Sequence, residues 1–414
     1  MKFKIKSGPY ISPYQDIIQQ LHHKQVREDD YFKSKKICLM GARRPIQNYG
    51  GIIPDEDLIG WGIRKTDFLN MTVIARSGAG KTATILKPLL NQYYKQGFKI
   101  LVFCPKKDEW SIVKRKGKGT RLHQFQKNEK MNVVSYSPSF VKNYLEKNDE
   151  IESSYKFYSY PIKTFIYPEV WGALGFTPTA SSHCVGLVNQ GVSKLKELQD
   201  KIKYATNLLP ISRNSAVDKI ESLQNAKFFN DTLKKLDFEK EWDENNNVIA
   251  INYFAQRGFM MSFDVWMLIE EVRKYCQRKQ TKGIYQPVII LFDDANFYAS
   301  PKDSFNHHSI KAILDTQSNY RSYGMNPIVS YQLPEMVDEE IRKSSEKYIL
   351  SSLYDVSALK GAIPEDVRYM LSAKMENNGL FHDKYTYTRE WVLVDDREGY
   401  RFFPMDCNIG HNYF

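Results

Sequence analysis

Met71-Thr-Val-Ile-Ala-Arg-Ser-Gly-Ala-Gly-Lys-Thr82 is a short apolar segment followed by a glycine-rich turn and a Lys-Thr pair. Val73 and Ile74 indicate a strand, and apolar residues recur at helical spacing after the turn. Pro88 is expected to bend that helix after its first turn. A second apolar segment, residues 99–103, then indicates another strand. The stretch therefore predicts a strand, a turn, a helix and a second strand in one βαβ unit.

The turn has the composition of a loop that binds nucleotide phosphates. In such a loop successive backbone N–H groups converge on the phosphates, helped by the positive end of the following helix. We expect Lys81 to reach the β- and γ-phosphates of ATP and the Thr82 hydroxyl to bind Mg²⁺. Ala75 replaces the first glycine of the pattern G-x-x-x-x-G-K-[ST]. The alternative is an ordinary Gly-Ala-Gly turn, which the order of strand, turn and helix argues against. The predicted nucleotide-binding residues are Ser77, Gly78, Ala79, Gly80, Lys81, Thr82 and Ala83.

A second group of candidate site residues follows a continuous apolar run at residues 287–292. This pattern is typical of a buried parallel strand that delivers acids to its carboxyl end. We expect Asp293 to hold Mg²⁺ through water, and Asp294 to orient or deprotonate the attacking water. Gln332 ends another predicted strand and is expected to sense the γ-phosphate or position the water. A strand that ends in an Asp-Asp turn is the alternative.

Composition limits the class of protein. With 414 residues, the chain is expected to form two domains or one large domain with an insertion. It lacks an apolar run of the length that spans a membrane, and its first residues lack the apolar core of a signal peptide, so we expect a cytoplasmic protein. The five cysteines are scattered, which argues against a zinc knuckle or a disulfide framework and favours buried thiols. The net charge of +11 suits a polyanionic partner without specifying one.

The order of these parts resembles the HerA/FtsK superfamily of P-loop ATPases, which are ring motors that move double-stranded DNA. The resemblance covers about Leu58 to the C-terminus and rests on the motifs above together with four further segments. These are residues 57–62 before the loop, residues 101–110, residues 321–334, and a terminal hairpin at residues 391–403. The family usually has Asp-Glu where this chain has Asp293-Asp294, and the side chain of Asp294 is one methylene shorter than that of glutamate.

The resemblance implies an α/β fold with a RecA-like P-loop NTPase core, a mostly parallel sheet and an inserted helical subdomain. The implied organisation is an N-terminal extension (1–57), a first core part (58–150), a mainly helical insertion (151–245) and a second core part with the hairpin (246–414). Residues 183–240 read as polar helices, as in the insertion of related motors. A basic run at residues 114–121 either contacts DNA phosphates or forms a solvated loop.

The resemblance also implies a homo-hexamer that hydrolyses ATP with Mg²⁺ and acts on double-stranded DNA. Motors of this type complete each site with an arginine from the neighbouring subunit, because the transition state carries negative charge on the γ-phosphoryl oxygens. Arg321 is the first candidate, Arg342 the second, and Arg76 a third that would act within its own subunit. Genome packaging, conjugative transfer and DNA processing are not separated by the sequence, so an accessory nuclease, relaxase or capsid partner is implied without a choice among them. Two other functions stay open, an assembly or secretion ATPase that acts on protein and a nucleotide-binding scaffold with little turnover.

Overall fold

The computed structural model describes residues 36–42, 58–64, 69–75, 81–106, 110, 131–147, 156–229, 233–350, 357–363, 365, 368, 390–395 and 401–406. Residues 76–80, which form most of the predicted phosphate loop and include Arg76, lie outside the described residues. The basic run at residues 114–121 also lies outside them.

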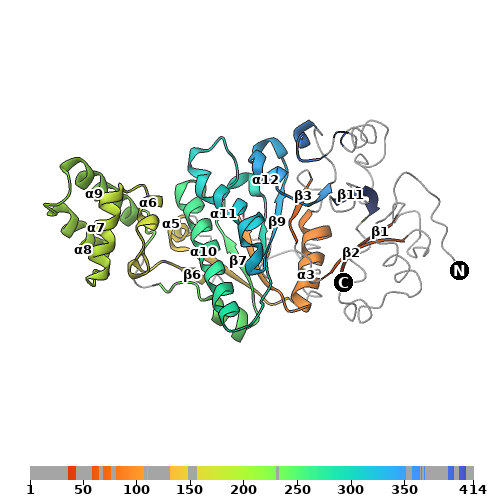
Figure 1. The fold of residues 1–414 in the computed structure, drawn as a ribbon, viewed down its shortest axis with the longest axis horizontal. Helices are drawn as coiled ribbons and strands as arrows, with labels where there is room; N and C mark the ends of the chain where they lie inside the picture. The colour runs from red at the N-terminus through yellow and green to blue at the C-terminus, as the bar shows by residue number, and fades with distance from the viewer. Residues whose placement is uncertain are drawn as a thin grey trace.

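A ten-stranded sheet forms the centre of the molecule (Figure 1). Its strands from β10 to β6 are parallel to their neighbours, and β11 and β12 add an antiparallel hairpin at one edge. The predicted α/β class, the mostly parallel sheet and the terminal hairpin are therefore confirmed. In spatial order the strands are β12 (Arg401–Asp406), β11 (Glu390–Asp395), β10 (Lys347–Leu350), β3 (Met71–Ile74), β9 (Met325–Tyr331), β8 (Val288–Phe292), β4 (Lys99–Cys104), β7 (Val248–Asn252), β5 (Val133–Pro138) and β6 (Lys156–Tyr158).

A separate two-stranded antiparallel sheet consists of β1 (Lys36–Ala42) and β2 (Leu58–Arg64). Strand β1 lies beside β12 and α3. Residues 58–62, which belong to the first of the four segments that carry the resemblance, therefore lie in β2, and this strand pairs with β1 and not with the central sheet.

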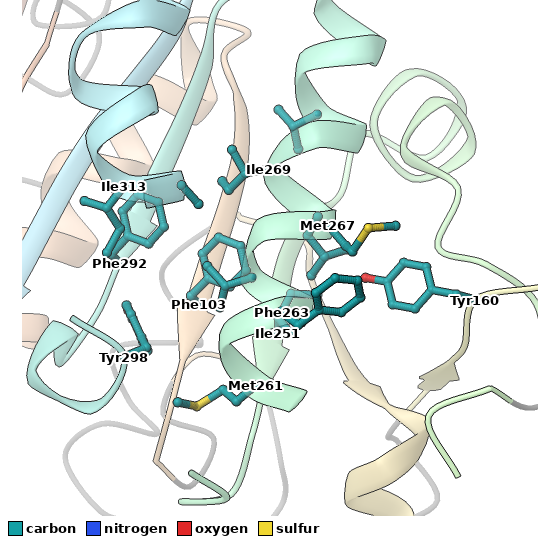
Figure 2. Packing of buried hydrophobic residues seen from close by; sticks show 14 of the residues in the cluster. Phe103, Tyr160, Ile251, Met261, Phe263, Met267, Ile269, Phe292, Tyr298 and Ile313 are labelled. Carbon is teal, nitrogen blue, oxygen red and sulfur yellow. The ribbon is translucent and has the colours of Figure 1, made fainter. Parts of the chain in front are cut away.

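Both faces of the central sheet are buried, which explains why its strands read as continuous apolar runs. On β4, Leu101 and Phe103 face one apolar cluster, while Ile100 and Val102 face another. Helices α10 (Phe259–Thr281) and α11 (His307–Gln317) contribute to the first cluster. Helix α3 (Lys87–Lys95) contributes to the second. Figure 2 shows the first face, where the rings of Phe103 and Phe292 stack with centroids 5.3 Å apart.

The helix after the phosphate loop begins with an irregular turn. Residues Lys81–Leu86 form a π-helical segment, and regular α-helix starts at Lys87. Pro88 is the second residue of α3, where its missing N–H does not interrupt the regular ladder. The bend expected at Pro88 stays a prediction; the structure shows a change in winding just before this residue, and π-helical turns are often found at functional sites. Gly97, with φ of +82°, allows the chain to leave the helix in the left-handed region and enter β4.

Four helices lie between β6 and β7 in sequence and project from one side of the sheet, at the left of Figure 1. Their inward apolar residues belong to the same cluster as the first face of the sheet. Helices are present where the sequence predicts them, but the last one ends at Asn225, well before residue 240. The four are α6 (Pro168–Ala173), α7 (Pro178–Asn189), α8 (Leu195–Lys203) and α9 (Pro210–Asn225).

A buried carboxylate ties the start of this insertion to the core. Tyr158 and Tyr160, just before the insertion, and Tyr253, just after β7, donate their hydroxyls to Asp264 of α10 at 2.5, 2.8 and 2.8 Å. Burial raises the pKa of Asp264 to about 6, and the three hydrogen bonds oppose that rise. The position of the insertion therefore depends on a polar cluster in an otherwise apolar region.

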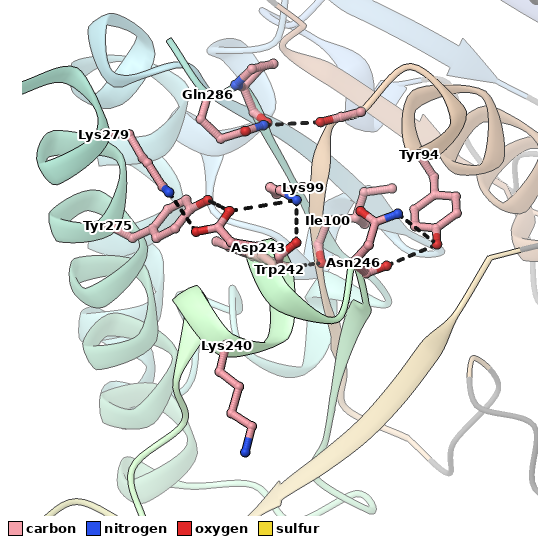
Figure 3. A network of polar contacts seen from close by, with 12 residues as sticks. Tyr94, Lys99, Ile100, Lys240, Trp242, Asp243, Asn246, Tyr275, Lys279 and Gln286 are labelled. Atoms are coloured by element: carbon pink, nitrogen blue, oxygen red, sulfur yellow. Dashed lines mark hydrogen bonds and ion pairs between the residues drawn. The ribbon is translucent and has the colours of Figure 1, made fainter. Parts of the chain in front are cut away.

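The amino ends of the strands carry a different network (Figure 3). Asp243, in the π-helical segment Lys240–Glu244, lies 2.7 Å from the Lys279 ammonium and 3.9 Å from that of Lys99. It also accepts a hydrogen bond of 2.8 Å from the Tyr275 hydroxyl. Burial lowers the pKa of Lys99, and the charge of Asp243 opposes this. These contacts link α10 to the edge of the sheet that lies opposite the carboxyl ends of the strands.

Cys104, Cys184 and Cys276 are buried free thiols, as predicted for cysteines in a core. Burial raises the pKa of Cys184 and of Cys276 to about 12, which keeps both protonated. Within the described ranges, no helix is both long and apolar enough to span a membrane.

Candidate active site

The predicted site residues come from three neighbouring strands of the sheet. Strand β9 lies between β3, which leads into the phosphate loop, and β8, which leads into the two acids. The register pairs Ile74 with Tyr331 and Phe292 with Val329. All three strands are parallel, so the start of the loop, Gln332 and Asp293 emerge at the same edge. This edge is where ligands bind in open α/β sheets.

The Lys81 side chain is buried against the start of the loop. Lys81 is only 7% exposed, and its Nζ donates to the carbonyl oxygen of Ala75 at 2.9 Å. Thr82 follows in the same π-helical turn and is half-buried. Ser77, Gly78, Ala79 and Gly80 lie outside the described residues, as does the side chain of Ala83. Their assignment to nucleotide binding stays a prediction.

Asp293 is held in one orientation by its neighbours. It is 6% exposed, Oδ1 accepts from the Asp294 backbone N–H at 3.0 Å, and Oδ2 accepts from Trp110 Nε1 at 3.1 Å. The Tyr298 hydroxyl donates to the Asp293 carbonyl oxygen at 2.7 Å. Burial, followed by the charge of Asp293, raises the pKa of Tyr298 well above its usual value, so the phenol stays a donor. Asp293 is thus a buried, oriented carboxylate at the end of β8.

Asp294 turns away from its neighbour because its backbone is left-handed, with φ of 46° and ψ of 49°. Asp tolerates this conformation better than most residues other than glycine. Its Oδ1 accepts from Gln332 Nε2 at 2.6 Å, and its Oδ2 lies 2.9 Å from Lys106 Nζ. Gln332 follows β9 and Lys106 follows β4, the two strands that flank β8. The carboxylate is therefore held from both sides.

This set of groups fits a nucleotide with Mg²⁺. Magnesium in nucleotide sites is bound by hard oxygen ligands, usually one or two from protein and the rest from phosphates and water. The Thr82 hydroxyl and the Asp293 carboxylate are of this kind. The two Asp293 oxygens accept from Trp110 and from the Asp294 backbone N–H, which fixes the direction in which the carboxylate would face a metal ion. A lysine, Lys81, supplies positive charge on the loop side of the site.

Arg321, the first arginine proposed to act between subunits, lies apart from this edge. Arg321 is in the 3₁₀ turn Asn319–Tyr323 that precedes β9, its side chain is 62% exposed, and NH1 lies 3.7 Å from Glu346. The seven residues of β9 separate this turn from Gln332, a distance of about 20 Å at about 3.3 Å per residue. Arg321 is thus too far to reach its own phosphates. Arg342 is in α12 (Glu339–Lys343), where Nε donates to the Val337 carbonyl at 3.1 Å.

Comparison with solved structures finds the same fold in another protein. VirB4 of Thermoanaerobacter pseudethanolicus matches with a TM-score of 0.51 at 12% identity, over 81% of this chain and 88% of VirB4. The chain shares the fold of VirB4 over this length. Its eight parallel strands and their flanking helices match the RecA-like P-loop NTPase fold that the sequence predicted.

Two other solved structures match less closely. The genome packaging NTPase B204 from Sulfolobus turreted icosahedral virus 2, in complex with ATP-gammaS, has a TM-score of 0.38 at 8% identity, over 83% of this chain and 98% of B204. The plasmid coupling protein TrwB, in complex with the non-hydrolysable GTP analogue GDPNP, has a TM-score of 0.43 at 12% identity, over 82% of this chain and 78% of TrwB. No family model and no curated protein sequence matches the chain.

Two residues of this candidate site have no role assigned from the sequence. Trp110 donates to Asp293, and Lys106 pairs with Asp294. Both belong to the segment after β4, whose carboxyl end reaches the same edge as β8 because the two strands are adjacent and parallel. The sequence signal for them is the segment 101–110 that carries part of the resemblance, whereas their contacts with the two acids follow from the strand order.

Proposed function

We propose that the protein is an ATP-dependent DNA-translocating motor of HerA/FtsK type, which hydrolyses ATP with Mg²⁺ to move double-stranded DNA. One observation carries the hydrolytic part of this proposal. The Asp294 carboxylate is hydrogen-bonded to Gln332 at the carboxyl edge of the sheet, and β9 alone separates its strand from the strand that leads into the phosphate loop. An amide and a carboxylate in contact there can together orient a water molecule toward a γ-phosphoryl group.

Each residue of the site has one role in this mechanism. The phosphate loop and Lys81 bind the phosphates, and Thr82 and Asp293 hold Mg²⁺, which neutralises phosphate charge when it is bound. Asp294 accepts a proton or a hydrogen bond from the attacking water, and Gln332 fixes the direction of the Asp294 carboxylate. Trp110 restricts Asp293 to one orientation through its 3.1 Å hydrogen bond. The arginine that completes the site comes from a neighbouring subunit, with Arg321 as the first candidate.

Binding to DNA is proposed from charge and from the helical insertion. The chain carries a net charge of +11, and four exposed lysines lie in or next to α8 on the projecting insertion, namely Lys194, Lys196, Lys201 and Lys203. Lys201 is paired with Glu197 at 3.1 Å. Lysines on a projecting surface bind backbone phosphates with little sequence preference. A ring of six subunits would place these insertions around a central duplex.

The deciding experiment is the rate of ATP hydrolysis with and without duplex DNA, together with the native mass. We expect duplex of unrelated sequences to stimulate hydrolysis, a hexamer to form, and log affinity for duplex to fall linearly with log salt because bound counterions are released. Lys81→Ala is the inactive control. If the parent hydrolyses ATP but duplex neither binds nor stimulates at any salt, the protein acts on something other than DNA, and the assembly or secretion ATPase replaces this proposal. A parent that binds ATP without turnover would be the nucleotide-binding scaffold.

A further inference from the structure

Lys106 forms an ion pair with Asp294, the residue to which the mechanism assigns the attacking water. Its Nζ lies 2.9 Å from Asp294 Oδ2, while Oδ1 already accepts from Gln332 at 2.6 Å. The Asp294 side chain is only 15% exposed, so solvent reaches little of it. A water molecule that is to bind Oδ2 in line with a phosphoryl group must share that oxygen with the Lys106 ammonium or displace it.

The contact of Lys106 with Asp294 is readily broken. The Lys106 side chain is 38% exposed, and ion pairs that are open to solvent contribute little net stability. Its other contact is with the ring of Phe297, whose centroid lies 5.6 Å from Nζ. The Arg257 guanidinium packs on the same ring at 4.0 Å. Two cations therefore share one aromatic ring beside Asp294, and their mutual repulsion favours departure of the more mobile one.

Lys106 also lies at the carboxyl edge of the sheet, where the nucleotide is proposed to bind. It follows β4 by two residues, at the carboxyl edge shared by Asp293, Asp294 and Gln332. A bound γ-phosphate adds more negative charge to this edge than the single carboxylate of Asp294. An ammonium on a flexible stem moves toward the stronger negative charge when the two lie close together.

We propose that Lys106 senses the γ-phosphate by exchanging partners. Without a γ-phosphate it pairs with Asp294 and takes one of the two acceptor positions of Oδ2. With ATP bound it pairs with the γ-phosphoryl oxygens, and both acceptor positions of Oδ2 become available to the attacking water. Lys106 is thus a positioning residue that prepares Asp294 for hydrolysis only when a triphosphate is present. The inference rests on the proposed ATPase function and adds a discrimination between ATP and ADP at the same site.

The test compares the affinity of ATPγS with that of ADP. Lys106→Met removes the charge and keeps the length of the stem, so ATPγS affinity should fall about tenfold, the loss of one charge-assisted contact, while ADP affinity stays within about twofold. Lys106→Arg should retain the preference for ATPγS. Lys282→Met is the matched control. Lys282 is an exposed lysine at the C-terminal end of α10, away from the carboxyl edge of the sheet, so its replacement should change neither affinity.

A second variant tests the exchange itself. Asp294→Asn removes the resting partner of Lys106, so ATPγS should bind more tightly, and the gain should disappear in the Lys106→Met, Asp294→Asn double variant. Equal loss of both nucleotides in Lys106→Met, or no loss of either, would overturn the proposal. If the parent binds both nucleotides but does not hydrolyse ATP, the proposed function fails and the ATPγS-to-ADP ratio still decides the role of Lys106. A parent that binds neither nucleotide would overturn both.

Discussion

Gln332 donates from Nε2 to Oδ1 of Asp294 at 2.6 Å, although 38 residues separate the two in sequence. The contact exists because β9 and β8 are adjacent and parallel, and each residue lies just beyond the carboxyl end of its strand. It joins the residue expected to sense the γ-phosphate to the residue expected to activate water. The consequences of the site for hydrolysis follow from this pair.

Asp294→Asn should stop hydrolysis without weakening nucleotide binding. The amide keeps the shape of the side chain but does not take a proton from water, and the contribution of a general base is typically about 100-fold or more. The measurement is steady-state hydrolysis alongside ATPγS affinity. Gln332→Ala should lower hydrolysis by a smaller factor, because the carboxylate survives but loses its orienting donor. Parent-like turnover in Asp294→Asn would show that another group activates the water.

Lys81→Ala should abolish nucleotide binding or turnover. The motif places only this side-chain cation on the phosphates, and in the structure its ammonium already points to the first residue of the loop, at 2.9 Å from the Ala75 carbonyl oxygen. Binding of a fluorescent ATP analogue and hydrolysis are the measurements. Lys282→Ala, which removes a lysine at the opposite edge of the sheet, serves as the control. The phosphate-loop assignment is wrong if Lys81→Ala hydrolyses ATP at the parent rate.

Asp264 should make the protein less stable as pH rises from about 4 to about 6. Its pKa is raised by burial to about 6 in the folded state, so over this range the folded chain holds a proton that the unfolded chain releases. The free energy of unfolding should therefore fall with rising pH, by about 3 kcal/mol from this group once both pKa values are passed. Urea unfolding at several pH values measures this. Asp264→Asn should flatten the pH dependence between those limits, compared with the parent.

The three tyrosines that donate to Asp264 allow a second test of this site by urea unfolding. Asp264→Leu would leave the hydroxyls of Tyr158, Tyr160 and Tyr253 without their acceptor in a buried site. We expect a loss of several kcal/mol, since each buried hydroxyl left unsatisfied costs about 1–3 kcal/mol. A leucine variant as stable as the parent would mean that water or other groups satisfy the tyrosines.

Arg321→Ala should leave ATP binding intact and remove most hydrolysis. Arg321 lies about 20 Å along the sheet from its own site, at about 3.3 Å for each of the seven residues of β9, so any catalytic role requires a neighbouring subunit. Mixing this variant with Lys81→Ala should restore some activity, because a mixed interface can pair an intact loop with an intact arginine. Native mass spectrometry of the mixture checks that mixed rings form. Without recovery in such rings, the role passes to Arg342 or to Arg76.

The sequence by itself determined the elements and the kind of chemistry. The strand at β3, the acids after β8 and the glutamine after β9 were each predicted from local patterns, because a strand buried on both faces is a continuous apolar run and its functional residues follow immediately. The change from π-helix to α-helix before Pro88 is not predicted by the sequence, which indicates only a bend at this proline. Lys81, Asp293 and Asp294 needed no tertiary information to be recognised as candidates, since their residue types and spacing suffice.

Only the tertiary structure decided which strand lies beside which, and with it the contacts that no local pattern contains. The placement of β4 against β8 brings Lys106 to Asp294 and Trp110 to Asp293, while β9 brings Gln332 to the other oxygen of Asp294. Arg321 lies at the opposite edge of the sheet, at the amino ends of the strands, because it precedes β9. Side-chain period and apolarity specify that a strand is buried and which residues end it. They do not specify its neighbours, because those depend on long-range pairing among strands that look alike in sequence.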